Sequence, residues 1–285
     1  MAIDYETLLN WRFEPIEQDY KDKDTILYAL GVGLGSEVTD ESQLRYVYEE
    51  NLAALPAMAT VLGYPGFWLK DPRTGVDWKQ VLHGEQFLKI HIPLPATGKV
   101  VGENRVTKLI DKGEGRGAVM FVERSLFDVA SGDLLCTLSA TTMLRGDGGF
   151  GGPSGSVPKP HRLPTTEPEL TCDLPTLQQA ALIYRLSGDR NPLHIDPQVA
   201  RLAGFERPIL HGLSTYGVVC HAVIRSVCNY QPERLRSFDV RFSSPVYPGE
   251  TIRTEMWVDG NVVSFRARVV ERDVVVLNNG RAEIV

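Results

Sequence analysis

Residues 184–197 read Tyr184-Arg-Leu-Ser-Gly-Asp-Arg-Asn-Pro-Leu-His-Ile-Asp-Pro197. Gly188 and Pro192 prevent a continuous helix here, so the backbone must turn and bring Asp189 and His194 together. A carboxylate and an imidazole that share one water form a general acid–base pair, and the carboxylate also fixes the tautomer of the imidazole. The alternative is ordinary turn chemistry, in which the aspartate caps the turn and the histidine is a buried structural residue.

The residues around this stretch predict short helices followed by strands. Thr176 and Gln179 have the spacing of a capping box for a helix through Leu186. Asp196 is expected to cap a helix that ends near Gly204, and an amphipathic helix is expected over 212–228. Alternating residues predict strands at 86–93, 99–110, 117–127, 133–145, 238–242, 251–258, 262–270, 274–277 and 281–284. A helix packed on a curved antiparallel sheet makes this an α+β protein.

Residues 146–170 divide the chain into two similar halves. This segment is rich in glycine and proline, so we interpret it as a linker between residues 1–145 and 171–285. Two short sequences recur in the same order in both halves. Ile26-Leu-Tyr-Ala-Leu30 matches Leu182-Ile-Tyr-Arg-Leu186 at an offset of 156 residues, and Leu82-His83-Gly84 is echoed by Leu210-His211-Gly212. The shared order favours an ancestral duplication.

The composition is that of a globular protein. Apolar residues make up 43% of the 285 residues and charged residues 23%. The formal net charge of −6 argues against nucleic-acid binding, which normally needs a basic face. The acidic, polar N-terminus is unlike a signal peptide, no apolar run is long enough for a membrane, and the C-terminus is not Ser-Lys-Leu. We therefore expect a cytoplasmic protein.

The cysteines predict neither disulfides nor a metal site. Four are present, Cys136, Cys172, Cys220 and Cys228. They form no C-x-x-C pair, and no cysteine–histidine cluster has the spacing of a zinc site. Free thiols in a reducing compartment are the expected state.

Two more segments complete a pattern with residues 184–197. They are Pro208-Ile-Leu-His-Gly-Leu213 and Arg241-Phe-Ser-Ser-Pro-Val-Tyr-Pro-Gly-Glu250. Together the three resemble the MaoC-like hydratases and dehydratases, the hydratase 2 class, and the resemblance covers almost the whole chain. It implies a double hot-dog fold, in which two antiparallel sheets, each wrapped on a central helix, join side by side. It also implies reversible hydration of trans-2-enoyl-CoA to (3R)-3-hydroxyacyl-CoA.

The resemblance also implies roles for single residues. The family's catalytic aspartate and histidine fall on Asp189 and His194, and its oxyanion-hole amide falls on Gly212. The first amides of a helix have no internal partner and attract an anion, which independently supports the role of Gly212. The residues expected to contact the substrate are Asn191, Arg190, Pro192 and Leu193 in the turn, and His83, Gly84, Lys112 and Phe242 elsewhere. Taken alone, His83 is typical of packed residues and Lys112 of solvated turns; in the family, Lys112 would contact a CoA phosphate.

The first half lacks the catalytic pair. Alignment of Tyr28 on Tyr184 places Gly33 opposite Asp189 and a valine opposite His194. We therefore expect this half to bind the acyl tail. Residues 51–68 are apolar but broken by two prolines and two glycines, which predicts either a wall around the tail or ordinary core with a loop.

We interpret the chain as an enoyl-CoA hydratase whose reacting water is held by Asp189 and His194. Three alternatives stay open: a hot-dog thioesterase, a non-catalytic acyl-CoA binder, and a dehydratase of branched or steroid-derived CoA thioesters. No metal or redox cofactor is needed, and coenzyme A is part of the substrate. The expected partners are an acyl-CoA thioester and a second copy of the chain in a homodimer, with no nucleic acid and no membrane.

Overall fold

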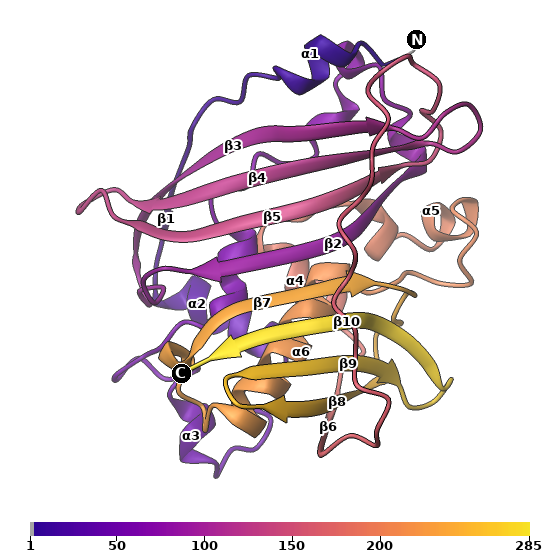
Figure 1. Ribbon diagram of the computed structural model, residues 1–285. Coiled ribbons are helices and arrows are strands. Elements are labelled where there is room, and N and C mark those ends of the chain that lie inside the picture. Colours follow the sequence, from indigo (N-terminus) through magenta and orange to yellow (C-terminus); the bar gives the residue numbers. More distant parts are fainter. Residues whose placement is uncertain (1–2) are drawn as a thin grey trace.

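The computed structural model describes residues 3–285, which contain one antiparallel sheet of ten strands (Figure 1). The order across the sheet is β1 (Ile16–Tyr20), β3 (Gly98–Asp111), β4 (Ala118–Asp128), β5 (Leu134–Leu144), β2 (Val81–Ile90), β7 (Leu235–Phe242), β10 (Val274–Ile284), β9 (Val262–Val269), β8 (Thr251–Asp259) and β6 (Leu170–Pro175). Each half contributes five neighbouring strands. The two sheets therefore join side by side, as expected, through hydrogen bonds between β2 and β7.

The sequence predicted most strands but not all. Strands β3, β4 and β5 lie close to their expected bounds, whereas β2 begins at Val81 rather than at residue 86. Strands β1 and β6, at the two edges, were not predicted. The expected break at 278–280 is a bulge within β10, where the register shifts and Asn279 has a φ of 53°. Asparagine tolerates this left-handed conformation, so the strand continues through it.

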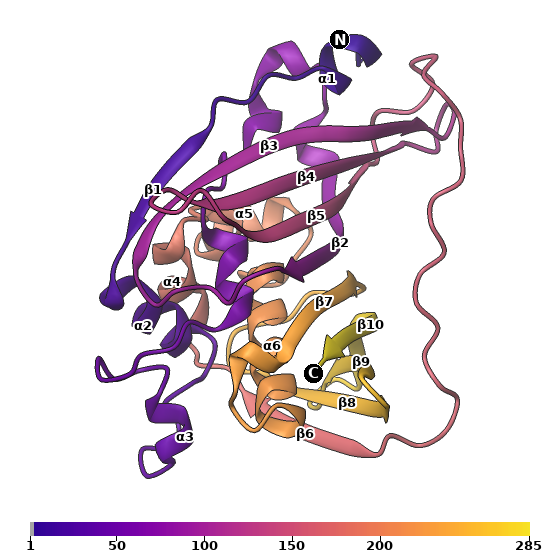
Figure 2. The ribbon, with the colours of Figure 1, turned by 60° about the vertical axis from the view of Figure 1, so that its left-hand side comes forward.

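Helices cover one face of the sheet (Figure 2). The long helix α6 (Gly212–Val227) confirms the prediction for 212–228, and its residues 214–224 are all buried. It packs against β6, β7 and β8 of its own half. The other α-helices are α1 (Tyr5–Leu9), α2 (Asp22–Gly31), α3 (Glu41–Leu44), α4 (Ala180–Tyr184) and α5 (Pro197–Leu202). The 3-10 helices are η1 (Pro56–Val61), η2 (Trp68–Lys70), η3 (Pro72–Thr74), η4 (Trp78–Gln80), η5 (Arg185–Ser187), η6 (Pro192–His194) and η7 (Pro232–Arg234).

The capping box predicted at Thr176 is wrong. Thr176 Oγ1 donates to the carbonyl oxygen of Glu250 and accepts from the N–H of Gly249, both at 2.9 Å. The helix therefore begins later, as α4. The predicted cap of the next helix is confirmed, because the Asp196 side chain accepts from the first backbone N–H groups of α5.

The first half has the short helix η1 where the second half has α6. Pro56 occupies the first position of η1, and the chain leaves this helix at Gly63. Gly63 has a φ of 59°, and a Cβ there would stand only 2.7 Å from the Cα of Gly102. This close approach to β3 ends the helix, so the expected central α-helix of the first half is replaced by one 3-10 helix that packs on α6.

The two halves are related by an internal repeat that the structure makes visible. Helices α2 and α4 pack together, and the rings of Tyr28 and Tyr184, matched in sequence, lie 5.9 Å apart. Pro56 and Gly212, also matched at the offset of 156 residues, are the first residues of η1 and α6. Likewise η4 leads into β2 as η7 leads into β7. These equivalences support the duplication. The predicted match of Leu82-His83-Gly84 with Leu210-His211-Gly212 is wrong, because the first lies in β2 and the second leads into α6.

The linker crosses the face of the sheet that the helices leave open (Figures 1 and 2). Residues 146–169 form no helix or strand. The linker is nevertheless held in place, because Trp257 Nε1 donates to the carbonyl oxygens of Thr166 and Glu167 at 3.0 Å. Asn279 donates to the carbonyl oxygen of His161 at 2.8 Å.

Across residues 3–285, no helix combines the length and the apolar character needed to cross a bilayer.

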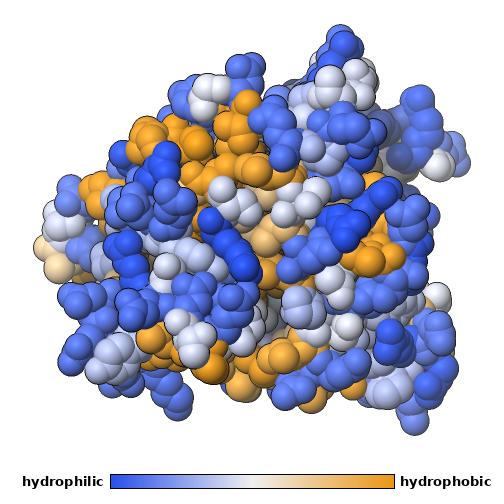
Figure 3. All heavy atoms as spheres, turned by 90° about the horizontal axis from the view of Figure 1, so that it is seen from below, coloured by the Kyte–Doolittle hydropathy of each residue, from blue (hydrophilic) through white to orange (hydrophobic). Residues whose placement is uncertain are grey.

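Polar side chains cover most of the face seen from below, and apolar side chains gather towards its upper left (Figure 3).

Candidate active site

The predicted turn lies between η5 and η6 and presents Asp189. Gly188 permits it by adopting a φ of 134°. Asp189 Oδ1 accepts the N–H of Asn191 at 3.0 Å, and Asn191 Oδ1 in turn accepts the N–H of Leu193 at 3.2 Å. Asn191 therefore caps η6, which delivers His194 one short turn later.

The hydrogen bonds of His194 define its tautomer. His194 Nδ1 lies 2.8 Å from the carbonyl oxygen of Ile209, which can only accept, so Nδ1 carries the proton. The lone pair of Nε2 is then free to take a proton from water. Burial lowers the pKa of His194, although the bond to Ile209 and the nearby Asp189 carboxylate partly oppose this. The ring is thus neutral at pH 7 and competent as a base.

His211 completes the site, and sequence reasoning missed it. Its Nε2 donates to the backbone carbonyl oxygen of Asp189 at 3.1 Å, and its ring stacks on His194 with centroids 3.7 Å apart. Burial, reinforced by His194, lowers the pKa of His211 to about 4. The sequence showed His211 in the supposed repeat of Leu82-His83-Gly84 and in the segment Pro208-Ile-Leu-His-Gly-Leu213, whose position beside the turn was the signal that could have found it.

Asp189, His194 and His211 each offer a ligand atom within 4.8 Å of the other two. One carboxylate and two imidazoles can in principle hold a transition metal. The imidazole planes are inclined by only 29°, however, so their in-plane lone pairs do not converge on one ion. The arrangement favours a proton-handling group over a metal centre, and a metal-free reaction stays a prediction.

Gly212, His83 and Phe242 form a wall beside the turn. Gly212 is the first residue of α6, so its backbone N–H has no partner within the helix. The residue is also exposed. The rings of His83 and Phe242 meet across the β2–β7 seam at 4.7 Å. A Cβ on Gly212 would stand 3.2 Å from the Phe242 ring, so the glycine keeps its amide accessible. Gly84 forms the β-bulge that follows His83 in β2.

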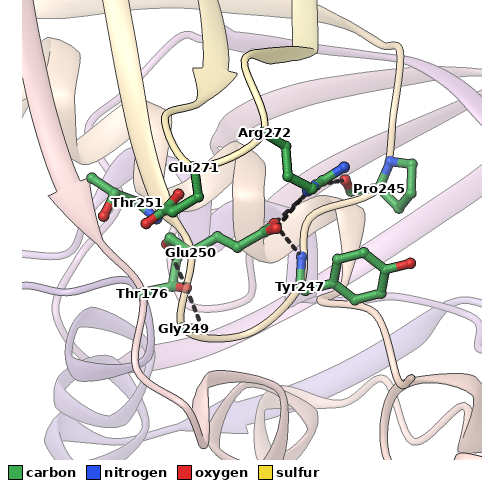
Figure 4. A network of polar contacts seen from close by, with 8 residues as sticks. All are labelled: Thr176, Pro245, Tyr247, Gly249, Glu250, Thr251, Glu271 and Arg272. Atoms are coloured by element: carbon green, nitrogen blue, oxygen red, sulfur yellow. Dashed lines mark hydrogen bonds and ion pairs between the residues drawn. The ribbon is translucent and has the colours of Figure 1, made fainter. Parts of the chain in front are cut away.

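A polar network surrounds Glu250 in the loop that follows β7 (Figure 4). The Glu250 carboxylate is buried, accepts the N–H of Tyr247 at 2.7 Å and pairs with Arg272 at 2.5 Å. These bonds fix the loop between β7 and β8. The carbonyl oxygen of Val246 in this loop accepts the N–H of Leu210 at 2.7 Å, directly before His211. The loop thereby positions the histidine and the Gly212 amide.

Tyr64 is a second residue that sequence reasoning did not single out. It belongs to the apolar segment 51–68, and Arg124 lies over its ring at 5.5 Å. Partial burial, with a contribution from the Asp189 carboxylate, raises the pKa of Tyr64 to about 12. The segment predicted as a wall of the tail site therefore reaches the electrostatic surroundings of Asp189.

Other predicted residues lie at the rim or farther away. Arg190 and Pro192 are exposed on the turn, and Leu193 is half-buried beside them. Lys112 is exposed on the turn after β3. Strands β4 and β5 separate β3 from β2, and three strand spacings amount to about 14 Å. The structure does not bring Lys112 to the turn that holds Asp189 and His194.

A small cavity joins the turn to the apolar segment of the first half. Its volume is about 90 Å³. Met58, Val61 and Leu62 line it from η1 and the residue that follows, and Leu186 and Ser187 line it from η5, two residues before Asp189. Gln18, Asp19 and Asp24 also line it, so one side of the cavity is apolar and the other is polar.

Comparisons with known families divide the chain at the linker. A family described as MFE-2 hydratase 2 N-terminal domain matches residues 18–146, and one described as MaoC like domain matches residues 158–280. A protein named probable enoyl-CoA hydratase 2 from Dictyostelium discoideum is 37% identical over all of this chain and 97% of its own length.

Solved structures agree. A MaoC-like dehydratase from Phytophthora capsici has a TM-score of 0.86 and 32% identity, with 99% of each chain covered. A protein from Mycobacterium tuberculosis described as having a double hotdog fold has a TM-score of 0.57 and 15% identity, with 97% of this chain and 98% of its own covered. The second likeness concerns the fold alone, and it confirms the double hot-dog prediction.

Proposed function

Because the chain belongs to the MaoC-like hydratases and dehydratases of the hydratase 2 class, we propose that it adds water to trans-2-enoyl-CoA and gives (3R)-3-hydroxyacyl-CoA, with dehydration as the reverse. One observation carries the proposal. The Asp189 carboxylate and a ring nitrogen of His194 lie within 4.8 Å of each other, beside the free amide of Gly212. A water fits between two such groups, and a thioester oxygen fits on the amide.

The proposed reaction conserves the atoms of one water. His194 Nε2 and the Asp189 carboxylate hold the water, and the pair accepts one of its protons as the hydroxide adds to C3. The same proton then goes to C2 from the same face. Negative charge develops on the thioester oxygen during attack, and the Gly212 N–H donates a hydrogen bond to that oxygen, which is worth about 3 kcal/mol.

The first half binds the acyl tail in this proposal. Gly33 stands where the second half has Asp189, so the first half has no acid–base pair of its own. The apolar side of the cavity, formed by Met58, Val61 and Leu186, supports a path for the tail between η1 and η5. Each buried methylene contributes about 0.8 kcal/mol, so substrates longer than four carbons should bind better until the path is filled. The family implies a 3R product, and a pair fixed on one face of the enoyl plane would give that single enantiomer.

A single preparation of the protein tests the reaction against its rivals. With crotonyl-CoA, hydration removes the absorbance of the conjugated thioester without release of a free thiol. Thiol release would support the thioesterase, and binding without turnover would support the non-catalytic binder. A 3S product would reject the family mechanism. Rates for straight-chain substrates up to decenoyl-CoA, compared with branched and steroid-derived thioesters, define the physiological class.

Further expectations belong to the same proposal. Lys112 contacts a CoA phosphate, so Lys112→Ala should raise KM for crotonyl-CoA but not for the corresponding pantetheine thioester. Activity should survive dialysis against EDTA, because no metal takes part. The protein is expected in the cytoplasm as a homodimer, which imaging of a tagged chain and light scattering would test.

A further inference from the structure

A second cavity lies at the other end of the β2–β7 seam. Its volume is about 300 Å³. It reaches Ile90, the last residue of β2, whereas His83 and the catalytic turn lie near the first residue of that strand. The other residues that line it come from both halves: Arg45, Leu52, Ala53, Ala54, Pro56, Pro93, Leu94, Pro95, Ala96, Cys136, Pro232 and Glu233.

The internal repeat makes this cavity the counterpart of the proposed active site at Asp189 and His194. Pro56 begins η1 as Gly212 begins α6, and η7 contributes Pro232 at the position that η4 holds before β2. The groups proposed to act in catalysis, however, have no counterparts here. Proline has no N–H, so the counterpart of the oxyanion amide is missing, and Gly33 stands where Asp189 would be. The repeat thus keeps the space of a binding site without its reacting groups.

The walls are apolar and already in place. Ala54, Ile90 and Cys136 are 3%, 6% and 1% exposed. Burial raises the pKa of the Cys136 thiol to about 12, so the floor carries no charge. The volume is at the lower end of the range for small-molecule sites, which suits a ligand of modest size.

Buried hydroxyls hold the loops that surround the cavity. Tyr20 donates to the carbonyl oxygen of Pro95 at 2.8 Å, and Thr25 donates to that of Ala96 at 2.6 Å. Tyr46, next to Arg45, donates to the carbonyl oxygen of Tyr230 at 2.8 Å and ties the two halves together. A preformed site loses little entropy when a ligand binds.

Arg45 is the residue of the cavity that can bind an anionic group of a ligand. Among the described residues that line the cavity, it is the one with a cationic side chain. Its partner Glu233 lies 3.6 Å away, and the two side chains are 40% and 48% exposed, so the pair is loose. One guanidinium suits a single carboxylate better than the several phosphates of a coenzyme.

We propose that this cavity binds a medium-chain carboxylic acid, with its alkyl chain against Ala54, Pro56 and Ile90 and its carboxylate on Arg45. The site goes beyond the hydratase reaction and does not depend on it. Longer chains within the volume of the cavity should bind more tightly, because each methylene adds apolar contact.

Calorimetric titration with decanoate tests the proposal. Arg45→Ala should weaken binding about fivefold, the scale of a partly exposed ion pair, and leave the backbone contact from Arg45 O to Ala53 N intact. Glu233→Gln should strengthen binding, because it frees Arg45 from a competing carboxylate. Arg236→Ala on β7 is the matched control and should bind as the wild type does. Ala54→Phe should fill the cavity and abolish binding.

Four outcomes would overturn the proposal, three with decanoate and one with decanoyl-CoA. The first is no decanoate binding to the wild type, and the second is equal affinity in the wild type and Arg45→Ala. The third is decanoate that competes with crotonyl-CoA and ignores the cavity variants, which would place it in the catalytic cleft. Decanoyl-CoA serves as a second probe: two bound molecules per chain, with one lost in Arg45→Ala, would show that the cavity takes a thioester instead of a free acid. Hydration of crotonyl-CoA by the same variants is measured in parallel, so failure of this site is distinct from failure of the enzyme.

Discussion

Replacement of Asp189 by asparagine removes one charge and little else. Asp189 Oδ1 accepts the N–H of Asn191 at 3.0 Å, and the amide oxygen of asparagine can accept the same bond. The half-buried carboxylate takes part in no ion pair within residues 3–285. We therefore expect the free energy of unfolding to change by less than about 1 kcal/mol.

The rate should respond far more strongly than the stability. The reacting water loses one of the two groups that hold it and relay its proton. General acid–base groups contribute about 10²–10⁴-fold, so kcat should fall by that factor, or about 3–5 kcal/mol in activation free energy.

The pH profile of the residual activity gives an independent sign. His194 must be neutral to accept a proton, so activity falls as the pH drops through its pKa. The Asp189 carboxylate raises that pKa against the effect of burial. Without the carboxylate the pKa of His194 falls further, and the acid limb of Asp189→Asn should lie at lower pH than that of the wild type.

The assay is hydration of crotonyl-CoA, with thermal unfolding to confirm the fold. Asp196→Asn is the matched control, because Asp196 is also a turn aspartate that accepts backbone N–H groups, but at the start of α5. It should keep wild-type kcat. The mechanism is refuted if Asp189→Asn keeps more than about a third of wild-type kcat while the control behaves normally.

Three other changes test the surroundings of the site. His211→Phe keeps a ring against His194 but removes the bond to the Asp189 carbonyl oxygen, so kcat should fall about tenfold in a folded protein; unchanged kinetics would deny it a positioning role. Burial raises the pKa of Asp239 from 3.8 to about 6, so ionisation of this carboxyl destabilises the fold as the pH rises through that interval. Asp239→Asn should therefore raise Tm at pH 7.5 and leave it unchanged at pH 3.5, and equal shifts at both values would contradict the assignment. Glu250→Ala leaves the N–H of Tyr247 without its acceptor and returns the exposed Arg272 to water, so it should cost about 1–3 kcal/mol in urea unfolding; a loss below about 0.5 kcal/mol would show the network to be dispensable.

Local patterns predicted the elements whose causes are local. The apolar spacing of 212–228 specified α6, and Asp196 with its proline specified the start of α5, because both signals act within a few residues. The box at Thr176 failed because its hydroxyl has a better partner across the fold, at Glu250. Edge strands β1 and β6 were missed because one side chain of β1 and two of β6 are buried, which leaves a weak apolar alternation.

The turn at Asp189 also has features with a local cause in the sequence and features that depend on the tertiary structure. Gly188 and Pro192 force the chain to turn, so the sequence alone determined that Asp189 and His194 lie near each other. It also determined that the first half has no such pair, since Gly33 replaces the aspartate.

Only the tertiary structure placed His211 on His194, Phe242 on His83, and Tyr64 within reach of the Asp189 charge. These contacts join residues from separate elements. Such contacts leave no local pattern in the sequence, so they could not be predicted from it. The cavity beside Arg45 likewise exists because the sheets of the two halves pair through β2 and β7. The local sequence therefore determines which side chains one turn can bring together. Burial of apolar surface between the two halves determines which residues of other elements lie against those side chains.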